Sequence, residues 1–468
     1  MRADTRLIAG IVAGAFFMQL LDSTIINTSL PQIAATFGVT PVGVSIGITI
    51  YLMSAAVFMP LSGWLADRFG SRNVFTAAIV LFTVASLCCG LASNLAQFGV
   101  ARAAQGVGGA LMTPVGRMVV LRSTEKSELL QAIALITWPA LAAPVVAPAL
   151  GGFITTYISW RWNFLLNVPL GVAGATLAAR FVPNSTAAGQ APLDWRGFAL
   201  AALALTALLY GLQSLSQARI DALLSGSLIL IGAVLGRLAI GHFAHTRHPL
   251  LQLSAAGVRT YAITSITAGS VFRIAIAATP FLLPLLFQLI FGLSALASGA
   301  LILIYFVGNM GIKPLTTPIL RRLGFRSVLV GNGILAGLAI AACAALTAST
   351  PHALLMAVLL VAGMTRSMQF TGLNSLAFAD ISAAQRSSAA TLSSVIQQVA
   401  AVLGVAFGAV ALNLGQMLGG ERAVSLRDFR LAFLVAGALA IAAALSCRRL
   451  NADAGEEVSG HRARRGAH

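Results

Sequence analysis

The chain has 468 residues, of which 58% are hydrophobic and only 9% carry a charged side chain. Soluble domains have about 25% charged residues, so this composition excludes a soluble globular protein. The formal net charge of +17 could suit nucleic-acid binding, but the 30 Lys and Arg residues form no long basic run, so we expect a polytopic membrane protein with no nucleic-acid partner.

Apolar stretches long enough to cross a bilayer recur from one end of the chain to the other. About 20 helical residues span roughly 30 Å of hydrocarbon. The first stretch continues through Gln19 and Asp22 without a small-residue cleavage site, so we interpret it as a span and not as a signal peptide. The pattern predicts an all-α protein with about 14 transmembrane helices, centred near residues 17, 55, 83, 109, 144, 172, 204, 230, 276, 308, 337, 365, 402 and 438.

The basic residues are distributed unequally between the two sides that these spans define. Of the 30 Lys and Arg residues, five fall in odd-numbered connections, 21 in even-numbered connections and the termini, and four within spans. Cytoplasmic connections carry the excess of Lys and Arg in membrane proteins. We therefore expect a multi-pass protein with both termini in the cytoplasm.

The stretch "PLSGWLADRFGSRNV" (60–74) aligns without gaps with "PLTTPILRRLGFRSV" (314–328), with six identities at an offset of 254 residues. Parallel repeats of six spans are a transporter architecture, with the substrate path between the halves. The repeat predicts a six-helix bundle over 1–183 and a second over 258–450. A linker with two extra transmembrane helices over 184–257 lies between them, and a cytoplasmic tail covers 451–468.

Several stretches in the same order as these spans resemble the major facilitator superfamily. They are "LDSTIINTSLP" in the first span, "GWLADRFGSR" (63–72), "ARAAQGVGGALMTPVGR" (101–117), "APALGGFI" (147–154), "SWRWNFLLNVPLGV" (159–172) and "FLLPLLFQLIFGLSALASGALIL" (281–303). Within that superfamily the chain resembles the fourteen-span drug:proton antiporters (EmrB/QacA-like), and most of all their MdtD-type branch. The resemblance implies a major facilitator fold and a place in the bacterial inner membrane.

Asp22 is the one acid of thirteen Asp and Glu residues that lies well within a predicted span. Ionisable groups inside membranes are costly and often mark a transport pathway or a proton relay. The resemblance places Asp22 on the first helix of its bundle and Arg102 on the fourth, and it implies proton coupling by these two residues. The alternative is that Asp22 is a structural hydrogen-bond acceptor that joins two spans.

The second half has no acid in a span, but it has Arg273, Arg366 and Lys313 there. Snorkelling is an alternative for Lys313, which lies nearer a span end. Because guanidinium groups match carboxylates geometrically, one hypothesis is that Arg273 and Arg366 form a clamp for an anionic substrate. Hydrogen bonding to backbone carbonyls is the other interpretation. We also expect substrate contacts from Gln369, one turn after Arg366, and from Gln19, one turn before Asp22.

Two further sets of residues are candidates for gating. In the loop after the second span, the resemblance implies that Asp67, Arg68 and Arg72, with Gly63 and Gly70, hold the cytoplasmic side closed in one state. A solvated loop is the alternative. Pro148, Gly151 and Gly152 predict a kinked, closely packed fifth span, which acts as a seal against leakage or is simply bent.

No group of residues predicts a metal site, a cofactor or an enzyme. The four cysteines all fall in apolar segments, and no Ser/His/Asp, HExxH or phosphate-loop pattern occurs. The sequence therefore predicts a proton-coupled antiporter that exports small organic molecules or drugs across the inner membrane by alternating access. Its expected partners are the substrate, protons and the bilayer, with function as a monomer. Alternatives are an exporter of organic anions such as small carboxylates and a non-coupled facilitator.

Overall fold

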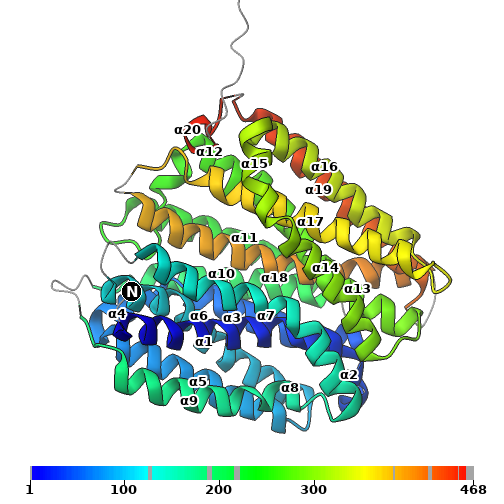
Figure 1. Cartoon of the computed structure of the whole chain (residues 1–468), viewed down its shortest axis with the longest axis horizontal. Coiled ribbons are helices and arrows are strands. Elements are labelled where there is room, and N and C mark those ends of the chain that lie inside the picture. Colours follow the sequence, from blue (N-terminus) through cyan, green and yellow to red (C-terminus); the bar gives the residue numbers. More distant parts are fainter. Residues whose placement is uncertain are drawn as a thin grey trace, which may run out of the picture. The chain divides into compact units, whose positions relative to one another are not determined.

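The computed structural model describes residues 3–124, 129–186, 192–215, 222–382, 385–419, 424–451 and 453–459. Helices joined by connections make up these ranges, and no strand occurs within them (Figure 1). The all-α fold class is therefore confirmed. Most of the predicted tail, 451–468, lies outside the described residues, so its structure stays a prediction. The chain divides into two units: 1–211 with 223–250 and 293–300, and 212–222 with 251–292 and 301–468.

Eleven helices lie wholly or mainly in the first unit. They are α1 (Ala3–Ile25), α2 (Leu30–Phe37), α3 (Pro41–Phe58), α4 (Leu61–Phe69), α5 (Ser71–Leu91), α6 (Leu95–Ser123), α7 (Leu129–Tyr157), α8 (Trp162–Leu165), α9 (Asn167–Phe181), α10 (Trp195–Ser214) and α11 (Ala222–His245). A short 3-10 turn, Ile26–Ser29, joins α1 to α2. The helices of the predicted linker, α10 and α11, thus belong mainly with the first unit, and the predicted domain boundaries remain a prediction.

The remaining helices lie wholly or mainly in the second unit. They are α12 (Arg259–Tyr261), α13 (Ala268–Leu285), α14 (Ala295–Gly311), α15 (Lys313–Leu323), α16 (Phe325–Ala342), α17 (His352–Ala377), α18 (Arg386–Gly419), α19 (Leu426–Ser446) and α20 (Glu456–Ser459). Two π-helical turns, Ala262–Ile266 and Leu286–Ile290, flank α13. The first six residues of α14 and the two residues before it, 293–300 in all, are grouped with the first unit.

Every predicted span centre falls within one of these helices. Among the described residues, 11 helical segments are long and apolar enough to cross a membrane, or 12 if α14 and α15, bent by 47°, form one span. The other two predicted spans are α6 and α7. Each has 29 residues, about 44 Å of helix, which is long enough to cross a membrane. Three arginines in α6 and three prolines in α7 make these two helices less apolar or less regular than the other spans. The count of fourteen crossings therefore stays a prediction.

The repeated loop has the same backbone conformation in both copies. Gly70 ends α4 with φ +91°, and Gly324, 254 residues later, ends α15 with φ +74°. Glycine adopts positive φ at little cost because it has no Cβ. The repeat seen in the sequence thus corresponds to a helix–glycine–helix turn in each unit.

Local capping defines where several spans begin. The Thr40 side chain accepts a hydrogen bond from the Gly43 amide at the start of α3, and Asn94 accepts one from the Gln97 amide at the start of α6. These bonds satisfy amides that have no partner within the helix. Within the first unit, α1 packs against α6, α7 and α9, which surrounds its last turns with other helices.

Candidate functional site

Asp22 lies in the last turn of α1, and its carboxylate is completely buried. One carboxylate oxygen, Oδ2, lies 2.7 Å from Nη1 of Arg102 on α6, whose side chain is also 0% exposed. The other oxygen, Oδ1, accepts hydrogen bonds from Gln105 at 2.8 Å and from Asn167 at 2.9 Å. The two predicted coupling residues are thus joined directly, and α9 supplies a third support through Asn167.

Ser86 on α5 connects the two amide side chains that hold Asp22. Its hydroxyl oxygen accepts from Gln105 at 3.1 Å and from Asn167 at 2.8 Å, and its own proton is donated to the Phe164 carbonyl at 3.1 Å. We call Asp22, Ser86, Arg102, Gln105 and Asn167 the polar cluster. All five side chains are at most 1% exposed, so water is excluded from them.

Aromatic rings surround the Arg102 guanidinium. Its Cζ lies 4.2 Å from the centre of the Tyr51 ring and 5.7 Å from that of Phe164, within the range of cation–π attraction. Its Nε donates a long bond, 3.4 Å, to the Gly47 carbonyl. Nη2 is buried without a hydrogen-bond partner among the described residues. Removing the charge of Asp22 would therefore leave a cation with few polar neighbours.

The polar cluster can hold one negative and one positive charge together out of water. A buried ion pair is stable only while both charges are present, since a lone buried charge is costly. A proton on Asp22 would end the pairing with Arg102. The cluster joins α1, α5, α6 and α9, so a change in its charge acts on the packing of four helices.

Gln19 is half-buried one turn before Asp22 on α1, outside the polar cluster. Its Oε1 accepts a hydrogen bond of 2.6 Å from Thr113 on α6. This bond joins the same two helices as the Asp22–Arg102 pair. The predicted substrate contact of Gln19 stays a prediction.

Asp67, which the sequence placed in a loop, lies in the last turn of α4 and pairs with a residue from outside the predicted gating set. Its Oδ1 lies 2.8 Å from Nη2 of Arg122, near the end of α6, and the two side chains are 42% and 34% exposed. Arg122 also donates to the carbonyl and hydroxyl oxygens of Ser185, which follows α9. Through Arg122, the end of α4 is thus tied to α6 and to the segment after α9.

The other predicted gating residues of this loop have different surroundings. The guanidinium of Arg68 lies 5.5 Å from the centre of the Trp64 ring, and Arg72 is half-buried at the start of α5. A Cβ at Gly70 would collide with the Asn184 side chain, whereas one at Gly63 would meet nothing within 4 Å. The backbone conformation at Gly70 therefore favours glycine, and a Cβ there would also require Asn184 to move, whereas neither factor applies at Gly63.

The fifth predicted span, α7, contacts its neighbours through its two adjacent glycines. Pro148 lies inside the helix, where its ring removes a backbone hydrogen bond. A Cβ at Gly151 would collide with Ile25 at the end of α1, and one at Gly152 with the backbone of Ala295 at the start of α14. The predicted close packing of α7 is thus present within the first unit, and its role as a seal stays a prediction.

In the second unit, Arg273 of α13 is buried, with 4% exposure. It donates to the Thr264 carbonyl at 3.1 Å and to the Asn374 side chain of α17 at 2.8 Å, and its Cζ lies 5.4 Å from the centre of the Phe370 ring. Its Nε is buried without a hydrogen-bond partner among the described residues. The bond from Nη1 to the Thr264 carbonyl is consistent with hydrogen bonding to the backbone. The Nε without a described partner is consistent with a substrate clamp, so both interpretations of Arg273 stay open.

Arg366 of α17 is half-buried and weakly held. Its one hydrogen bond to a described residue, the Tyr305 hydroxyl, is 3.5 Å long, and the rings of Tyr305 and Phe306 lie 5.6 and 5.9 Å from its Cζ. Phe370, which stacks on Arg273, is one helical turn from Arg366. Neither arginine pairs with a carboxylate in the part of the chain that the structure describes.

The amide of Gln369 joins α17 to α16. Its nitrogen donates to the Leu329 carbonyl at 2.8 Å, and its oxygen accepts from Asn332 at 3.0 Å. The side chain is 1% exposed. Both ends of the amide therefore have protein partners here, and the predicted substrate contact of Gln369 stays a prediction.

A further polar pair lies in the predicted linker. His242, in the last turn of α11, places Nε2 2.8 Å from Oδ1 of Asp194, just before α10. Burial acts to raise the pKa of the Asp194 carboxyl, but hydrogen bonds from the Gly197 amide, His242 and the Leu250 amide outweigh it. The pKa therefore lies below its usual value of 3.8.

Sequence reasoning found Asp22 and Arg102 but missed the rest of the polar cluster. Gln105 follows Arg102 by three residues and so shares its helix face, a spacing that could have been used. Asn167 and Ser86 come from distant segments, and no local pattern brings them to Asp22. Arg122 was likewise counted only as a cytoplasmic charge.

Comparison with known proteins gives consistent matches over nearly the whole chain. The family described as "Major Facilitator Superfamily" matches residues 12–405, with a second match over 265–465. A protein of Cronobacter sakazakii named for multidrug resistance, MdtD, is 35% identical over 86% of this chain and 85% of its own. The protein of the same name from Escherichia coli O6:H1 is 35% identical over 88% of this chain and 87% of its own. A crystal structure of a D-xylose-proton symporter has a TM-score of 0.69 at 13% identity, covering 95% of this chain and 97% of that one, which shows the fold.

Proposed function

This chain belongs to the Major Facilitator Superfamily, and we propose that it is a proton-coupled antiporter that exports small organic molecules by alternating access. It is a membrane transporter and not an enzyme, and it is a multi-pass protein of the bacterial inner membrane. The relatives named for multidrug resistance support drugs or similar organic molecules as substrates. The expected orientation, with both termini in the cytoplasm, is part of this proposal.

The observation that carries the proposal is the buried pair of Asp22 and Arg102. A transporter that couples to protons needs a group inside the membrane whose charge changes during the cycle. Asp22 meets this need, because its charge is balanced by a single cation and its other oxygen is held by two neutral amides. Protonation would release Arg102, and loss of the proton would restore the pair.

The two states would differ in the packing of α1 against α6. With Asp22 ionised, the charge attraction and the hydrogen bonds hold α1, α6 and α9 together. With Asp22 protonated, the attraction to Arg102 is lost, and the helices are free to shift. We propose that this switch is the link between proton movement and the change of access, with the Asp67 loop and α7 as gates.

A second candidate function, export of organic anions, is favoured by the cations of the second unit. Arg273 has a buried Nε without a partner among the described residues, and Arg366 has one long hydrogen bond. Neither is neutralised by a described carboxylate, so an anionic substrate would supply the missing charge. A clamp by Arg273 and Arg366 would bind small carboxylates better than lipophilic cations.

Everted membrane vesicles with an imposed proton gradient test both proposals. The proposal predicts that addition of a substrate collapses the gradient in vesicles with the natural protein. Asp22→Asn should abolish this response but keep substrate exchange down a concentration gradient. The matched control is Asp194→Asn, which removes a carboxylate outside the membrane spans. This variant should respond like the natural protein. A gradient-driven response that survives in Asp22→Asn contradicts proton coupling through this residue.

The substrate panel separates the two candidates. Small carboxylates and lipophilic cationic dyes would be tested side by side, with Arg366→Gln as the variant. A carboxylate response that is lost in Arg366→Gln supports anion export. A dye response that is unchanged in Arg366→Gln contradicts the clamp and leaves drug efflux. Downhill flux without any gradient collapse in the natural protein would instead indicate a facilitator.

A further inference from the structure

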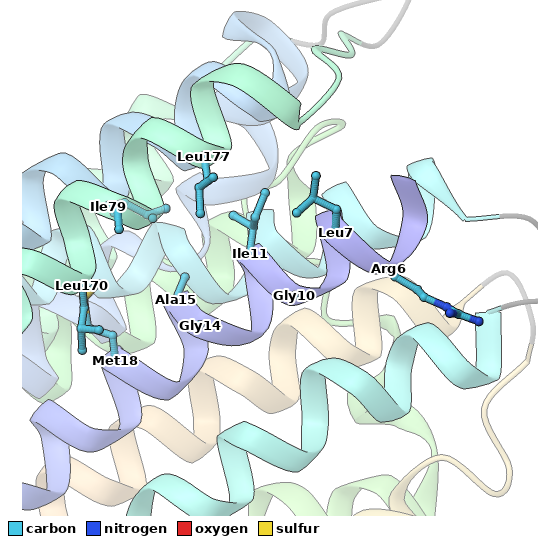
Figure 2. Close-up of a pocket in the computed structure, with 12 residues that line it drawn as sticks. Arg6, Leu7, Gly10, Ile11, Gly14, Ala15, Met18, Ile79, Leu170 and Leu177 are labelled. Atoms are coloured by element: carbon cyan, nitrogen blue, oxygen red, sulfur yellow. The ribbon is translucent and has the colours of Figure 1, made fainter. Parts of the chain in front are cut away.

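A groove of about 350 Å³, which none of the polar-cluster residues lines, opens on the first unit between α1, α5 and α9 (Figure 2). Ile11, Ala15, Met18 and Ile79 form its buried floor. Its rim carries exposed leucines, which are Leu7 at 39%, Leu170 at 44% and Leu177 at 39% exposure. The groove is therefore apolar and open to the surroundings of the helices, which in a membrane are acyl chains.

The space in this groove exists because α1 has glycines there. Gly10 and Gly14 line it, and a Cβ at either residue would meet nothing within 4 Å. A glycine inside a helix costs about 1 kcal/mol relative to alanine. At other positions the cost is explained by packing: a Cβ at Gly108 of α6 would collide with the backbone of α5. Among the described residues no such neighbour accounts for Gly10 and Gly14, so they leave room for an occupant from outside the chain.

The length of the groove matches one leaflet of a bilayer. Along α1 it runs from Arg6 to Met18, about 18 Å of helix. Half of the hydrocarbon core is about 15 Å thick. A lipid chain lying in the groove would therefore extend from the level of its headgroup to about the middle of the membrane.

Positive charge lies at one end of the groove. Arg6 lines that end and is exposed, and Figure 2 shows its side chain extending outward beyond Leu7, on the other side of the α1 ribbon from Leu177 of α9. Arg180 follows Leu177 by one helical turn and is also exposed. The arrangement thus has arginines at the end that lies at headgroup level and hydrocarbon along its length.

We propose that this groove binds an anionic membrane phospholipid, with one acyl chain along Gly10 and Gly14 and the phosphate at Arg6 and Arg180. The apolar walls exclude a polar metabolite, and the arginines favour a negatively charged headgroup over a zwitterionic one. None of the polar-cluster residues lines the groove, so the proposed lipid is a component of the structure and not a transported substrate. This inference does not depend on proton coupling.

Native mass spectrometry of the full chain in detergent tests the proposal. The probes are a palmitoyl-oleoyl phosphatidylglycerol and the phosphatidylcholine with the same acyl chains. The natural protein should retain one phosphatidylglycerol more tightly than any phosphatidylcholine. Gly10→Leu, which fills the groove, should lose that lipid, whereas Gly241→Leu is a matched control on α11 whose new side chain also enters open space.

Arginine variants test the headgroup. Arg6→Gln should weaken binding of phosphatidylglycerol roughly fivefold, the effect of one arginine near an anionic surface, without changing phosphatidylcholine binding. Arg237→Gln, an exposed arginine of α11, should leave both unchanged. Gly14→Leu provides a second filled groove if Gly10→Leu does not fold. Three results would overturn the proposal. They are tight binding of phosphatidylglycerol by Gly10→Leu or Gly14→Leu, an equal loss of that lipid in Gly241→Leu, and equal affinity of the natural protein for phosphatidylglycerol and phosphatidylcholine.

Discussion

The Asp22 carboxylate lies 2.7 Å from the Arg102 guanidinium, and neither side chain has any exposed surface. The pair links α1 to α6, and Gln105 and Asn167 hold the second oxygen of Asp22. Two opposite charges in such a place are stable together and unstable apart, because neither can be solvated after the other is removed. The stability and the transport activity of the protein should therefore respond differently to single and double substitutions.

Single neutral substitutions in this pair should be more destabilising than the double one. Asp22→Asn and Arg102→Gln each leave one buried charge and should lower the free energy of unfolding by about 3–5 kcal/mol. The variant with both changes leaves no charge and should recover part of that loss. Thermal unfolding of the purified variants measures this. Additive losses in the double variant would contradict a direct coupling of the two residues.

The Asp67–Arg122 pair should matter for transport more than for stability. Both side chains are partly exposed, so Asp67→Asn or Arg122→Gln should change the free energy of unfolding by less than about 1 kcal/mol. If the pair holds the loop in one state, both variants should lower the export rate to a similar extent. Exchanging the two residues, Asp67→Arg with Arg122→Asp, should restore part of the rate. A normal rate in both single variants would show that the loop is only a solvated connection.

Substitution of the two repeated glycines should be destabilising. Gly70 and Gly324 have φ of +91° and +74°, a conformation that costs other residues about 1–3 kcal/mol. Gly70→Ala and Gly324→Ala should therefore lower the midpoint of thermal unfolding. Gly331→Ala on α16 is the control, since a Cβ there meets nothing within 4 Å and alanine favours the helix. Equal midpoints for Gly331→Ala and the other two variants would exclude the backbone explanation.

Asp194 should make a pH-dependent contribution to stability. The folded-state pKa of its carboxyl lies below the usual 3.8, so its contribution is present above pH 3.8 and is lost as the pH falls through the folded-state value. At pH 7, Asp194→Asn should therefore unfold at a lower temperature than the natural protein. This difference should disappear in strong acid. A difference that is independent of pH would show that the charge of Asp194 is not involved.

Much of the fold could be predicted because hydropathy and helix breaking are local properties. Each predicted centre lies in a helix, including α6 and α7, where arginines and prolines weaken the apolar signal. The repeat was visible because Gly70 and Gly324 must both adopt a backbone conformation that glycine favours. Asp22 stood out because it is an acid inside an apolar span.

The partners of the charged residues could not be predicted, since they depend on contacts between distant helices. Asn167 reaches Asp22 across 145 residues, and Arg122 reaches Asp67 across 55. Asn and Gln occur in many spans, and their residue type does not show which helix they will contact. Gln369 illustrates this, because it follows Arg366 by three residues but hydrogen-bonds to α16.

Proton release on substrate binding is the measurement that tests the central claim most directly. The purified protein, in weakly buffered detergent solution with a pH indicator, would be mixed with a substrate found in the vesicle panel. Release of protons by the natural protein, and none by Asp22→Asn that still binds the substrate, is the predicted result. The same release from Asp22→Asn, with unchanged affinity, would contradict the assignment of Asp22 as the proton carrier.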